Sequence, residues 1–474
     1  MVASLFIPST PCIFKVGCYN ETTKTERGFS MTFAEKMDQY LDKYLELYKL
    51  SGIFRVTHKD EIIYQRCMGY ADIEHKVPFD NSTVFTLYSM SKPFCCFAVM
   101  TLVDKGLIDL DDHPGKYLPE AAGADSRITV RRLMNHTSGL RDFNQERAYE
   151  ATFINDHNPD LRPHVAHMVS LPLNFEPGTA TRYTNLNFTI LALIVENVSG
   201  MPYRDYMLQH VFTPMGMKHT QVDRLGLLAD HRARGYGISG DTLVANDRLN
   251  PDSFMGAGDV ISDIEDVYRL NTVMKHRGLL SEQSWKEILT PSDVGVFGLG
   301  CQVWDWHGKR RIQHNGGSRG FRTLHIWLPE DDLDIILLSN FGFGDARWSL
   351  TNAVYTAFYG DETVEAEATN MDFIESVRVL PEGFLPQRKP AITLTAEQEA
   401  RILGTYDPNG DNTNPVTLTK RPDGTYCITT DGWQQHWCYP VSETVLASCN
   451  LDEAHKLAFA DDGTVTLNGW VKIH

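Results

Sequence analysis

The sequence predicts an α/β sandwich, an antiparallel sheet flanked by helices, followed by a small C-terminal β-barrel or sandwich domain. Strand-like runs lie near both ends of the first 360 residues, at 52–57, 62–70, 298–306, 310–315, 321–328 and 333–340. A mainly helical section separates the two groups, and short strands divided by turns follow from about residue 396. Early and late strands that share one sheet, with helices around it, make an α/β sandwich.

Local patterns justify the first elements. Residues 1–30 are rich in Pro, Gly and Thr and are predicted to be irregular. Apolar residues at helical spacing predict an amphipathic helix over 33–48. The polar residues Lys59, Asp60 and Glu61 predict the turn of a hairpin between the first two strands.

The helical section begins at about Ser89. The apolar run 84–88 precedes it, and apolar residues then recur at helical spacing up to Gly106. Residues 128–140 are typical of a helix that ends in a tight turn. Further helices are predicted at 188–198, where Gly200 provides the cap, at 263–276 and at 346–359.

Composition changes divide the chain into four parts. Residues 1–30 form an irregular N-terminal segment, and 31–360 contain the predicted sandwich. Residues 361–392 are acidic and then Pro-rich, which indicates a linker. Residues 393–474 carry the short strands and turns of the small β-domain.

The segment Ser89-Met90-Ser91-Lys92 is the strongest candidate for chemistry. Residues three apart on a helix share a face, so the Lys92 amine can reach the Ser89 oxygen. A serine hydroxyl becomes nucleophilic when a neighbouring base takes its proton, and a desolvated lysine can be that base. Taken alone, the spacing is more often that of an N-cap serine with a solvated lysine.

Three further segments accompany this pair, and together they identify a family. They are Tyr183-Thr184-Asn185, which precedes an apolar helix, the run 135–140 (NHTSGL), and His314-Asn315-Gly316-Gly317 between strand-like runs. In this order they closely resemble the serine β-lactamase and penicillin-binding-protein superfamily, in its class C-like esterase and D-aminopeptidase branch. The resemblance extends over about residues 35–360 and includes the run 107–119 (LIDLDDHPGKYLP).

The resemblance implies roles for individual residues. Ser89 would be the acyl-enzyme nucleophile, with Lys92 and Tyr183 as its proton relay. The backbone N–H groups of Ser89 and Gly317 would form the oxyanion hole. Substrate-binding residues would be Asn185, His314, Asn315 and Gly316. Nearby positive charge would favour ionisation of the Tyr183 phenol, and which member of the relay takes the first proton stays open.

One position departs from the pattern of many relatives. Many β-lactamases and carboxypeptidases have Lys-Thr-Gly where this chain has His314-Asn315-Gly316. A lysine there is a permanent cation suited to a substrate carboxylate, whereas histidine is mostly neutral at pH 7. The esterase and aminopeptidase members resemble this chain more closely, so β-lactam hydrolysis is the least favoured activity.

Composition restricts the partners. The 474 residues are 42% hydrophobic, enough for a deep core and more than one domain. The formal charge of -17, from 44 basic and 61 acidic residues, argues against a nucleic-acid partner. No secretory signal and no membrane-spanning run is recognised. A small molecule or a short peptide is the expected substrate, and a homo-oligomer is compatible with the sequence.

Cysteine and histidine usage bears on compartment and metals. The nine cysteines lack the spacing of a disulfide framework or metal site, so we expect free thiols and a cytoplasmic location. His157, His164 and His167 lie close in sequence without a carboxylate partner. The run 407–411 begins like a calcium loop but has Leu418 where the late glutamate belongs. We therefore expect no metal and no cofactor.

Three functions remain open at this point. The first is a serine hydrolase that forms an acyl-Ser89 intermediate on an ester or amide, as an esterase or a D-amino-acid-type peptidase or amidase. The second is an acyltransferase that passes the same acyl group to an alcohol or amine. The third is a non-catalytic binding protein on a β-lactamase-like fold. The acyl group, leaving group and stereochemical preference are not legible in the sequence.

Lipocalin-like β-domains follow the catalytic part in several hydrolases of the superfamily. Residues 393–474 are similar to such a domain in length and pattern. The resemblance therefore implies a small lipocalin-like β-barrel or sandwich.

Overall fold

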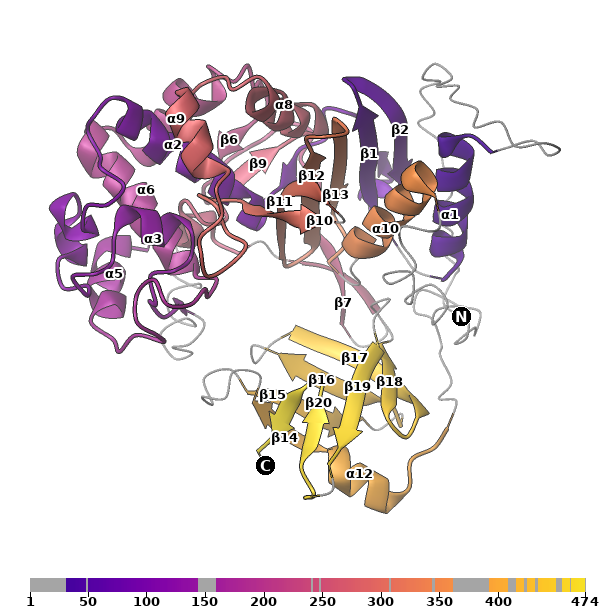
Figure 1. Ribbon diagram of the computed structural model, residues 1–474. Coiled ribbons are helices and arrows are strands. Elements are labelled where there is room, and N and C mark those ends of the chain that lie inside the picture. The colour runs from indigo at the N-terminus through magenta and orange to yellow at the C-terminus, as the bar shows by residue number, and fades with distance from the viewer. Residues whose placement is uncertain are drawn as a thin grey trace.

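A computed structural model gives the structure of the protein (Figure 1). It describes residues 31–47, 50–143, 159–239, 242–246, 249–306, 308–342, 346–360, 392–407, 415–421, 424–430, 434–448, 454–460 and 462–473. The predicted N-terminal segment, the predicted linker except its last residue, and His157 lie outside these residues.

The central element is a six-stranded antiparallel sheet with the strand order β10-β11-β12-β13-β1-β2. The strands are β1 (Gly52–His58), β2 (Glu61–Met68), β10 (Gln302–Trp306), β11 (Lys309–Ser318), β12 (Phe321–Leu328) and β13 (Leu333–Ser339). The early and late strands of the sheet meet where β1 pairs with β13, with Gly52 opposite Ser339. The predicted α/β sandwich is thus confirmed.

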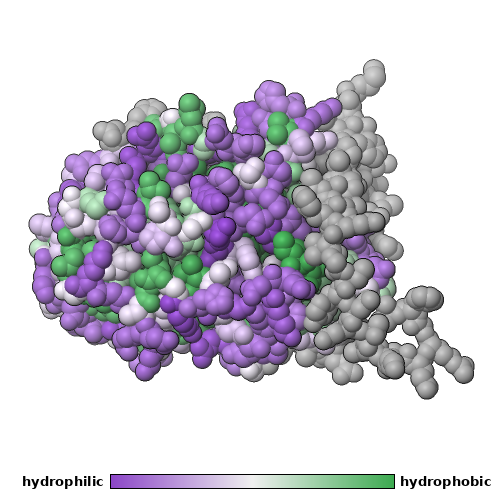
Figure 2. Space-filling model, turned by 90° about the horizontal axis from the view of Figure 1, so that it is seen from above, coloured by the Kyte–Doolittle hydropathy of each residue, from purple (hydrophilic) through white to green (hydrophobic). Residues whose placement is uncertain are grey.

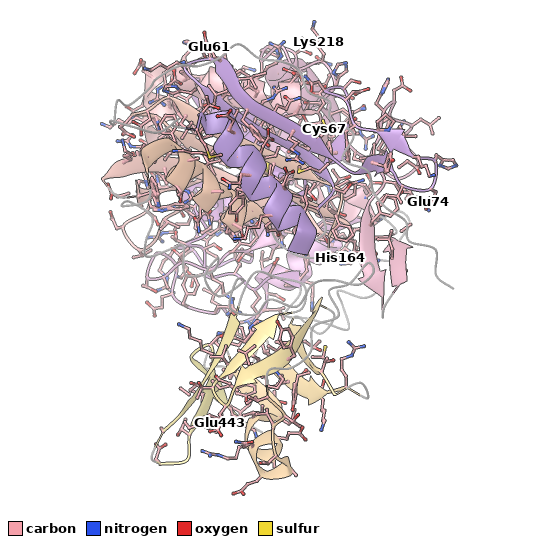
Figure 3. All side chains as sticks on the ribbon, turned by 90° about the vertical axis from the view of Figure 1, so that its right-hand side faces the viewer. Glu61, Cys67, Glu74, His164, Lys218 and Glu443 are labelled. Carbon is pink, nitrogen blue, oxygen red and sulfur yellow. The ribbon has the colours of Figure 1, made fainter. Side chains whose placement is uncertain are left out.

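Both faces of this sheet are covered. On one face α1 (Phe33–Leu47) and α10 (Ala346–Tyr359) pack together, as Figures 1 and 3 show. Successive residues of β13 alternate between two cores: Ile335 and Leu337 belong to the core under α1 and α10, and Ile336 and Leu338 to the larger helical core. A strand buried on both faces reads as a continuous apolar run, as β13 does.

The β1–β2 turn follows the prediction. Lys59 and Asp60 both have positive φ, 50° and 65°, which is the backbone of a two-residue hairpin turn. Glu61 is the first residue of β2, and Figure 3 shows it near one end of that strand with Cys67 farther along.

The helical section packs around α2 (Lys92–Asp104). Its elements are α3 (Val130–Met134), α5 (Leu161–Val169), α6 (Asn185–Ser199), α7 (Tyr203–Met207), a π-helical turn at Leu208–Phe212, α8 (Ile264–Lys275) and α9 (Glu282–Ile288). All residues of α2 from Lys92 to Leu102 are buried, because neighbouring helices and the sheet surround it. Gly200 caps α6 with φ 69°, as predicted.

Short pairings that the sequence did not indicate hold the turn before α2. Strand β5 (Phe85–Thr86) pairs with β9 (Val260–Ser262), which also pairs with β6 (Gln221–Val222). Two further hairpins are β3 (Tyr70–Asp72) with β4 (Val77–Pro78), and β7 (Tyr236–Ser239) with β8 (Thr242–Ala245). The β5–β9 pairing brings residues near 260 against the Ser89 turn.

The C-terminal strands form a closed eight-stranded barrel, β14 to β21 in sequence order. They are β14 (Gly404–Asp407), β15 (Val416–Lys420), β16 (Tyr426–Thr430), β17 (Gln434–Ser442), β18 (Val445–Ser448), β19 (Ala454–Phe459), β20 (Val465–Leu467) and β21 (Trp470–Lys472), preceded by α12 (Ala396–Ile402). Pairing of Tyr406 with Lys472 closes the ring. Closure removes the unpaired edges, which confirms the barrel alternative of the prediction.

The surface is polar with scattered apolar side chains, as Figure 2 shows for the face seen from above. Within the described residues, no helix combines the length and the apolar character needed to cross a bilayer. Six cysteines in this part of the chain are buried and outside any disulfide: Cys67, Cys95, Cys96, Cys301, Cys427 and Cys438.

Candidate active site

Ser89 lies in a 3₁₀ turn, Tyr88–Ser91, that leads directly into α2. Tyr88 has φ 48°, a left-handed backbone that is costly for an aromatic residue and is maintained by its surroundings. The Ser91 hydroxyl donates to the Tyr88 carbonyl at 2.6 Å and accepts from the Val260 N–H at 2.9 Å. Strand β9 thereby fixes the turn that presents Ser89.

Lys92 is fully buried, and its amine sits among three oxygen atoms. Its Nζ lies 3.2 Å from Ser89 Oγ, 2.9 Å from Asn185 Oδ1 and 2.7 Å from the carbonyl of Ala257. Asn185 is the first residue of α6, so α2, α6 and the segment before β9 converge on this amine. The structure thus brings together the Ser, Lys and Asn that the sequence singled out.

The environment of Lys92 favours the neutral amine. Burial lowers the pKa of Lys92 to about 7, because desolvation penalises the ammonium form. The carboxylates Asp142 and Asp259 oppose this shift but do not cancel it. A substantial fraction of Lys92 is therefore able to accept a proton near pH 7.

Tyr183 completes the group. The Lys92 amine lies 4.7 Å from the centre of its ring, and its hydroxyl interacts with Ser89. The ring of His136 packs against that of Tyr183, with 4.5 Å between centroids, and Phe297 borders the same ring at 6.1 Å. This packing orients the phenol toward Ser89.

The expected ionisation of Tyr183 is wrong in direction. Burial of the hydroxyl raises the pKa of Tyr183, and nearby Asp142 raises it further. Tyr183 as a whole is 36% exposed. Lys92, with its pKa lowered to about 7, is only partly charged near neutral pH and does not offset the effect of burial on the phenol. Tyr183 is therefore suited to passing a proton on, and Lys92 to taking the first one.

Strand β11 lies against the turn that carries Ser89. A Cβ atom on Gly316 would lie 1.9 Å from the carbonyl oxygen of Leu87, so only glycine lets the strand approach the turn this closely. Thr323 on β12 donates to the same carbonyl at 2.9 Å. Gly317 is exposed one residue farther along β11, and Asn315 is half-buried. The backbone of Gly317 thus lies on the strand that contacts the nucleophile turn.

His314 is buried and neutral. Burial and nearby Lys92 lower the pKa of His314 to about 3. Its Nδ1 donates to the Asn315 carbonyl at 2.7 Å, which leaves Nε2 as an acceptor, and Nε2 has no hydrogen-bond partner among the described residues. The sequence predicted a substrate-binding role for this histidine, and that role stays a prediction.

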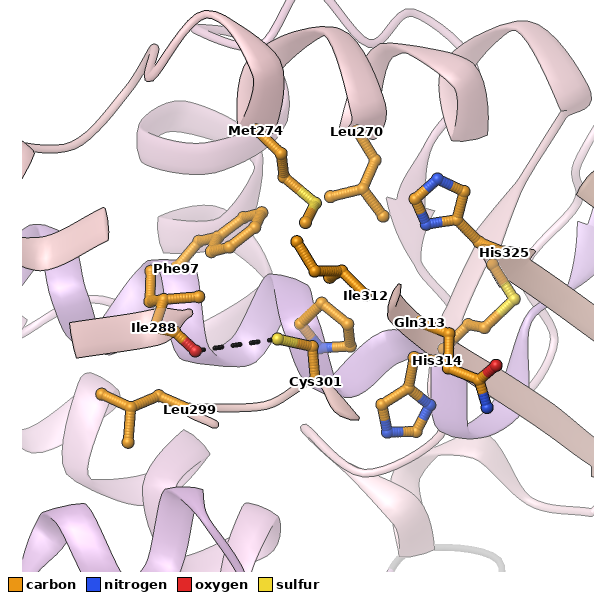
Figure 4. Close-up of a pocket in the computed structure, with 12 residues that line it drawn as sticks. Phe97, Leu270, Met274, Ile288, Leu299, Cys301, Ile312, Gln313, His314 and His325 are labelled. Atoms are coloured by element: carbon orange, nitrogen blue, oxygen red, sulfur yellow. Dashed lines mark hydrogen bonds between the residues drawn. The ribbon is translucent and has the colours of Figure 1, made fainter. Parts of the chain in front are cut away.

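An apolar cavity lies beside His314 (Figure 4). His325 and Cys301 also line it, and the Cys301 thiol donates to the Ile288 carbonyl at 3.8 Å. Its volume of about 10 Å³ is close to the minimum for one water molecule. This cavity is too small to hold a substrate.

Several functional neighbours escaped the sequence analysis. They are Asp142, His136, Ala257 and Asp259, which all surround Lys92, Tyr183 or Asn185. His136 belongs to a segment that was recognised, but its contact with Tyr183 was not foreseen. A single aspartate in a loop, such as Asp142, carries no spacing signal.

Several histidine and aspartate side chains outside the Ser89 site are candidate metal ligands. His164 and His167 lie on α5. Within the described residues, His219, Asp263 and Asp266 place ligand atoms within 4.8 Å of one another. The carboxylates are already engaged: Asp263 caps α8 and contacts His219, and Asp266 accepts from the His219 N–H at 2.7 Å. This group acts as a helix cap rather than as an assembled cation site.

Comparison with known proteins decides the family. The beta-lactamase family model matches residues 37–355, about two thirds of the chain. The chain belongs to the beta-lactamase family. Penicillin-binding protein 4* of Bacillus subtilis is 29% identical to this beta-lactamase family protein over 319 residues, covering 62% of this chain and 69% of the relative.

Solved structures share the fold of this family member. D-amino acid amidase from Ochrobactrum anthropi has a TM-score of 0.59 at 22% identity and covers 68% of this chain and 98% of its own. An octameric penicillin-binding protein homologue from Pyrococcus abyssi has a TM-score of 0.60 at 18% identity, covering 93% of this chain and 99% of its own. The family and the arrangement at Ser89 together support serine-hydrolase-type chemistry.

Proposed function

We propose that this protein is a serine hydrolase that forms an acyl-Ser89 intermediate on an amide or ester substrate. The observation that carries the proposal is the buried Lys92 amine 3.2 Å from Ser89 Oγ. A lysine at the surface would be protonated at neutral pH and could not accept the serine proton, whereas a desolvated one can.

The geometry supports the following sequence of steps. Neutral Lys92 accepts the Ser89 proton as Oγ attacks the substrate carbonyl carbon. The backbone N–H groups of Ser89 and Gly317 donate to the oxyanion that develops. Tyr183 passes a proton to the leaving amine or alcohol when the tetrahedral intermediate collapses. Water then attacks the acyl-enzyme, and the same relay returns the proton to Ser89.

The favoured substrates are a D-amino-acid amide, a short peptide or an ester of a small acyl group. The similarity to D-amino acid amidase supports the amide alternative. Neutral His314 bears instead on carboxylate recognition. The position of His314 on β11 therefore provides no cation to bind the carboxylate of a β-lactam or peptide. We therefore place β-lactam hydrolysis last among the activities.

A probe and substrate series tests the proposal. The pure protein is incubated with a fluorophosphonate, p-nitrophenyl esters and D- and L-aminoacyl p-nitroanilides, beside Ser89→Ala. We expect labelling on Ser89, located by mass spectrometry, and turnover that falls at least about 10³-fold in the variant. Added alcohols or amines that become acylated would indicate acyl transfer. Equal labelling and turnover in both proteins would refute the role of Ser89.

The location and assembly of the protein remain predictions. Cysteines that are buried and outside any disulfide are compatible with a reducing, cytoplasmic compartment. The octameric relative spans nearly the whole chain, including most of the C-terminal barrel, and this supports the proposal of a homo-oligomer. Analytical ultracentrifugation of the full chain measures the assembly directly.

A further inference from the structure

Asp142 is a buried carboxylate at the start of α6, and no step of the mechanism above uses it. Its Oδ1 accepts the backbone N–H groups of Asn185 at 2.9 Å and Leu186 at 3.1 Å. Its Oδ2 accepts the side-chain amide of Asn185, also at 2.9 Å. The side chain is 6% exposed, so water contributes little to its partners.

These contacts dictate which way the Asn185 amide faces. An ionised carboxylate only accepts hydrogen bonds, so the NH₂ group of Asn185 must face Asp142. The Asn185 oxygen then necessarily faces the Lys92 amine, 2.9 Å away. Burial raises the pKa of Asp142, whereas the backbone N–H groups of Leu186, Asn185 and Phe143 and nearby Lys92 oppose this shift and favour the ionised, accepting form.

The amide orientation in turn aims the lone pair of Lys92. A neutral amine has two hydrogens and one lone pair. The hydrogens are taken by two fixed acceptors, Asn185 Oδ1 at 2.9 Å and the Ala257 carbonyl at 2.7 Å. The third neighbour is Ser89 Oγ at 3.2 Å, so the lone pair is left to face the serine hydroxyl.

We propose that Asp142 is a positioning residue, which fixes the Asn185 amide and so directs the Lys92 lone pair at Ser89. The inference rests on the proposed function, because it matters only if Lys92 deprotonates Ser89. The hydrogen bonds of Asp142 that carry this role go to Asn185 and Leu186. Asp142 acts through Asn185, one hydrogen bond removed from the base.

Asp142→Asn tests this with almost unchanged shape. The asparagine oxygen can still accept both backbone N–H groups, but its NH₂ would then meet the NH₂ of Asn185. Asn185 must rotate its amide, which turns a donor toward Lys92 and draws the lone pair away from Ser89. We expect the rate constant for fluorophosphonate labelling of Ser89 to fall about 10²-fold, within the range of general-base effects.

A second substitution restores the pattern of donors and acceptors. In Asp142→Asn combined with Asn185→Asp, residue 142 donates and residue 185 accepts from both sides, and the total charge is unchanged. We expect the double variant to label at least about tenfold faster than Asp142→Asn, with each rate taken at its plateau on a profile from pH 6 to 9.5. The probe is suitable because it reports serine attack without needing the amide donor of Asn185.

Asp263→Asn is the matched control. Asp263 is also a buried carboxylate that caps a helix, α8, but it lies outside the Ser89 site. Its substitution should lower the unfolding midpoint and leave labelling unchanged.

The outcomes separate the two hypotheses. A wild-type protein that does not label at Ser89 overturns the proposed function. A wild type that labels, with Asp142→Asn labelling equally fast or the double variant showing no recovery, overturns the positioning role of Asp142.

Discussion

Lys92 shows how burial turns a common cation into a base. Among the described residues its amine has no carboxylate in direct hydrogen-bonding contact, and its three partners are a hydroxyl, an amide and a backbone carbonyl. Neutral partners do not replace the hydration that the ammonium loses, and this desolvation lowers its pKa. The chemistry at Ser89 therefore depends on the core around α2 as much as on the motif.

The pH dependence of acylation follows from this pKa. Lys92 must be deprotonated to act, so activity should rise with pH through its pKa of about 7. We expect kcat/KM to fall about tenfold per pH unit below that value. The measurement is kcat/KM on a p-nitrophenyl ester between pH 5 and 9.5, with folding checked by circular dichroism. Activity that stays constant down to pH 5 would contradict Lys92 as the base.

Asp259 is the necessary control for that profile. Burial raises the pKa of Asp259 to about 7, so its titration overlaps with that of Lys92. The Asp259 anion stabilises the Lys92 ammonium, and Asp259→Asn removes this effect. We expect the acidic limb to persist in the variant and to move to lower pH. Loss of the limb would assign it to Asp259 instead.

At the residue scale, the sequence identified Ser89, Lys92, Tyr183 and Asn185 as one group, and the structure places them together. The sequence could not show whether the pKa of Tyr183 is raised or lowered, because that depends on how deeply the hydroxyl is buried. Asp142 was missed for a similar reason: it is distant from Asn185 in sequence and approaches it only in the fold.

At the scale of elements, the close approach of β11 to the Ser89 turn is decisive. The two contact each other through Gly316 and Leu87, and Thr323 on β12 supports the same carbonyl. Backbone donors can serve as an oxyanion hole only if the strand and the turn keep a fixed spacing. Gly316 sets that spacing, since any side chain would push the two elements apart.

Gly316→Ala tests the spacing. The added Cβ would meet the Leu87 carbonyl at 1.9 Å, so β11 must move away from the turn. A displacement of about 1 Å at reacting groups costs about 10²-fold, and we expect kcat to fall by that order. The matched control is Gly123→Ala, where no atom lies within 4 Å of the new Cβ. Full activity of Gly316→Ala in a folded protein would contradict this function of the glycine.

The long, periodic elements could be predicted and the short ones could not. The hairpin β1–β2, the strands of the late group and the helices α1, α6, α8 and α10 follow the apolar spacing of the sequence. The pairing of β5 with β9 joins two-residue and three-residue segments about 175 residues apart. Segments of that length have no periodicity to recognise, and their pairing is set by the packing around them.

At the scale of the whole molecule, the described apolar cores divide into separate sets. Two cores, with the hydrophobic residues packed against them, contain only residues from Phe33 to Tyr359, and the third contains only residues from Ile392 to Trp470. No described barrel residue belongs to a core of the first part. Each part therefore satisfies its own burial, as an independent folding unit does.

Truncation after residue 391 tests that division. We expect the shortened chain to remain folded and to keep turnover within about twofold of the full protein on a small ester. The full chain should show a second unfolding transition that the truncated chain lacks. The measurement is differential scanning calorimetry with parallel assays. An aggregated or inactive truncated protein would show that the barrel completes the catalytic part.

The sequence by itself determined the α/β sandwich, the small C-terminal β-domain, the order of the main elements and the group of residues around Ser89. Those features depend on local periodicity and on residue types whose chemistry is legible one segment at a time. The tertiary structure decided the protonation of Lys92 and Tyr183, the role of Gly316 and the contact of Asp142 with Asn185. Each of these arises from desolvation or from close approach between distant segments, and both exist only once the chain has packed.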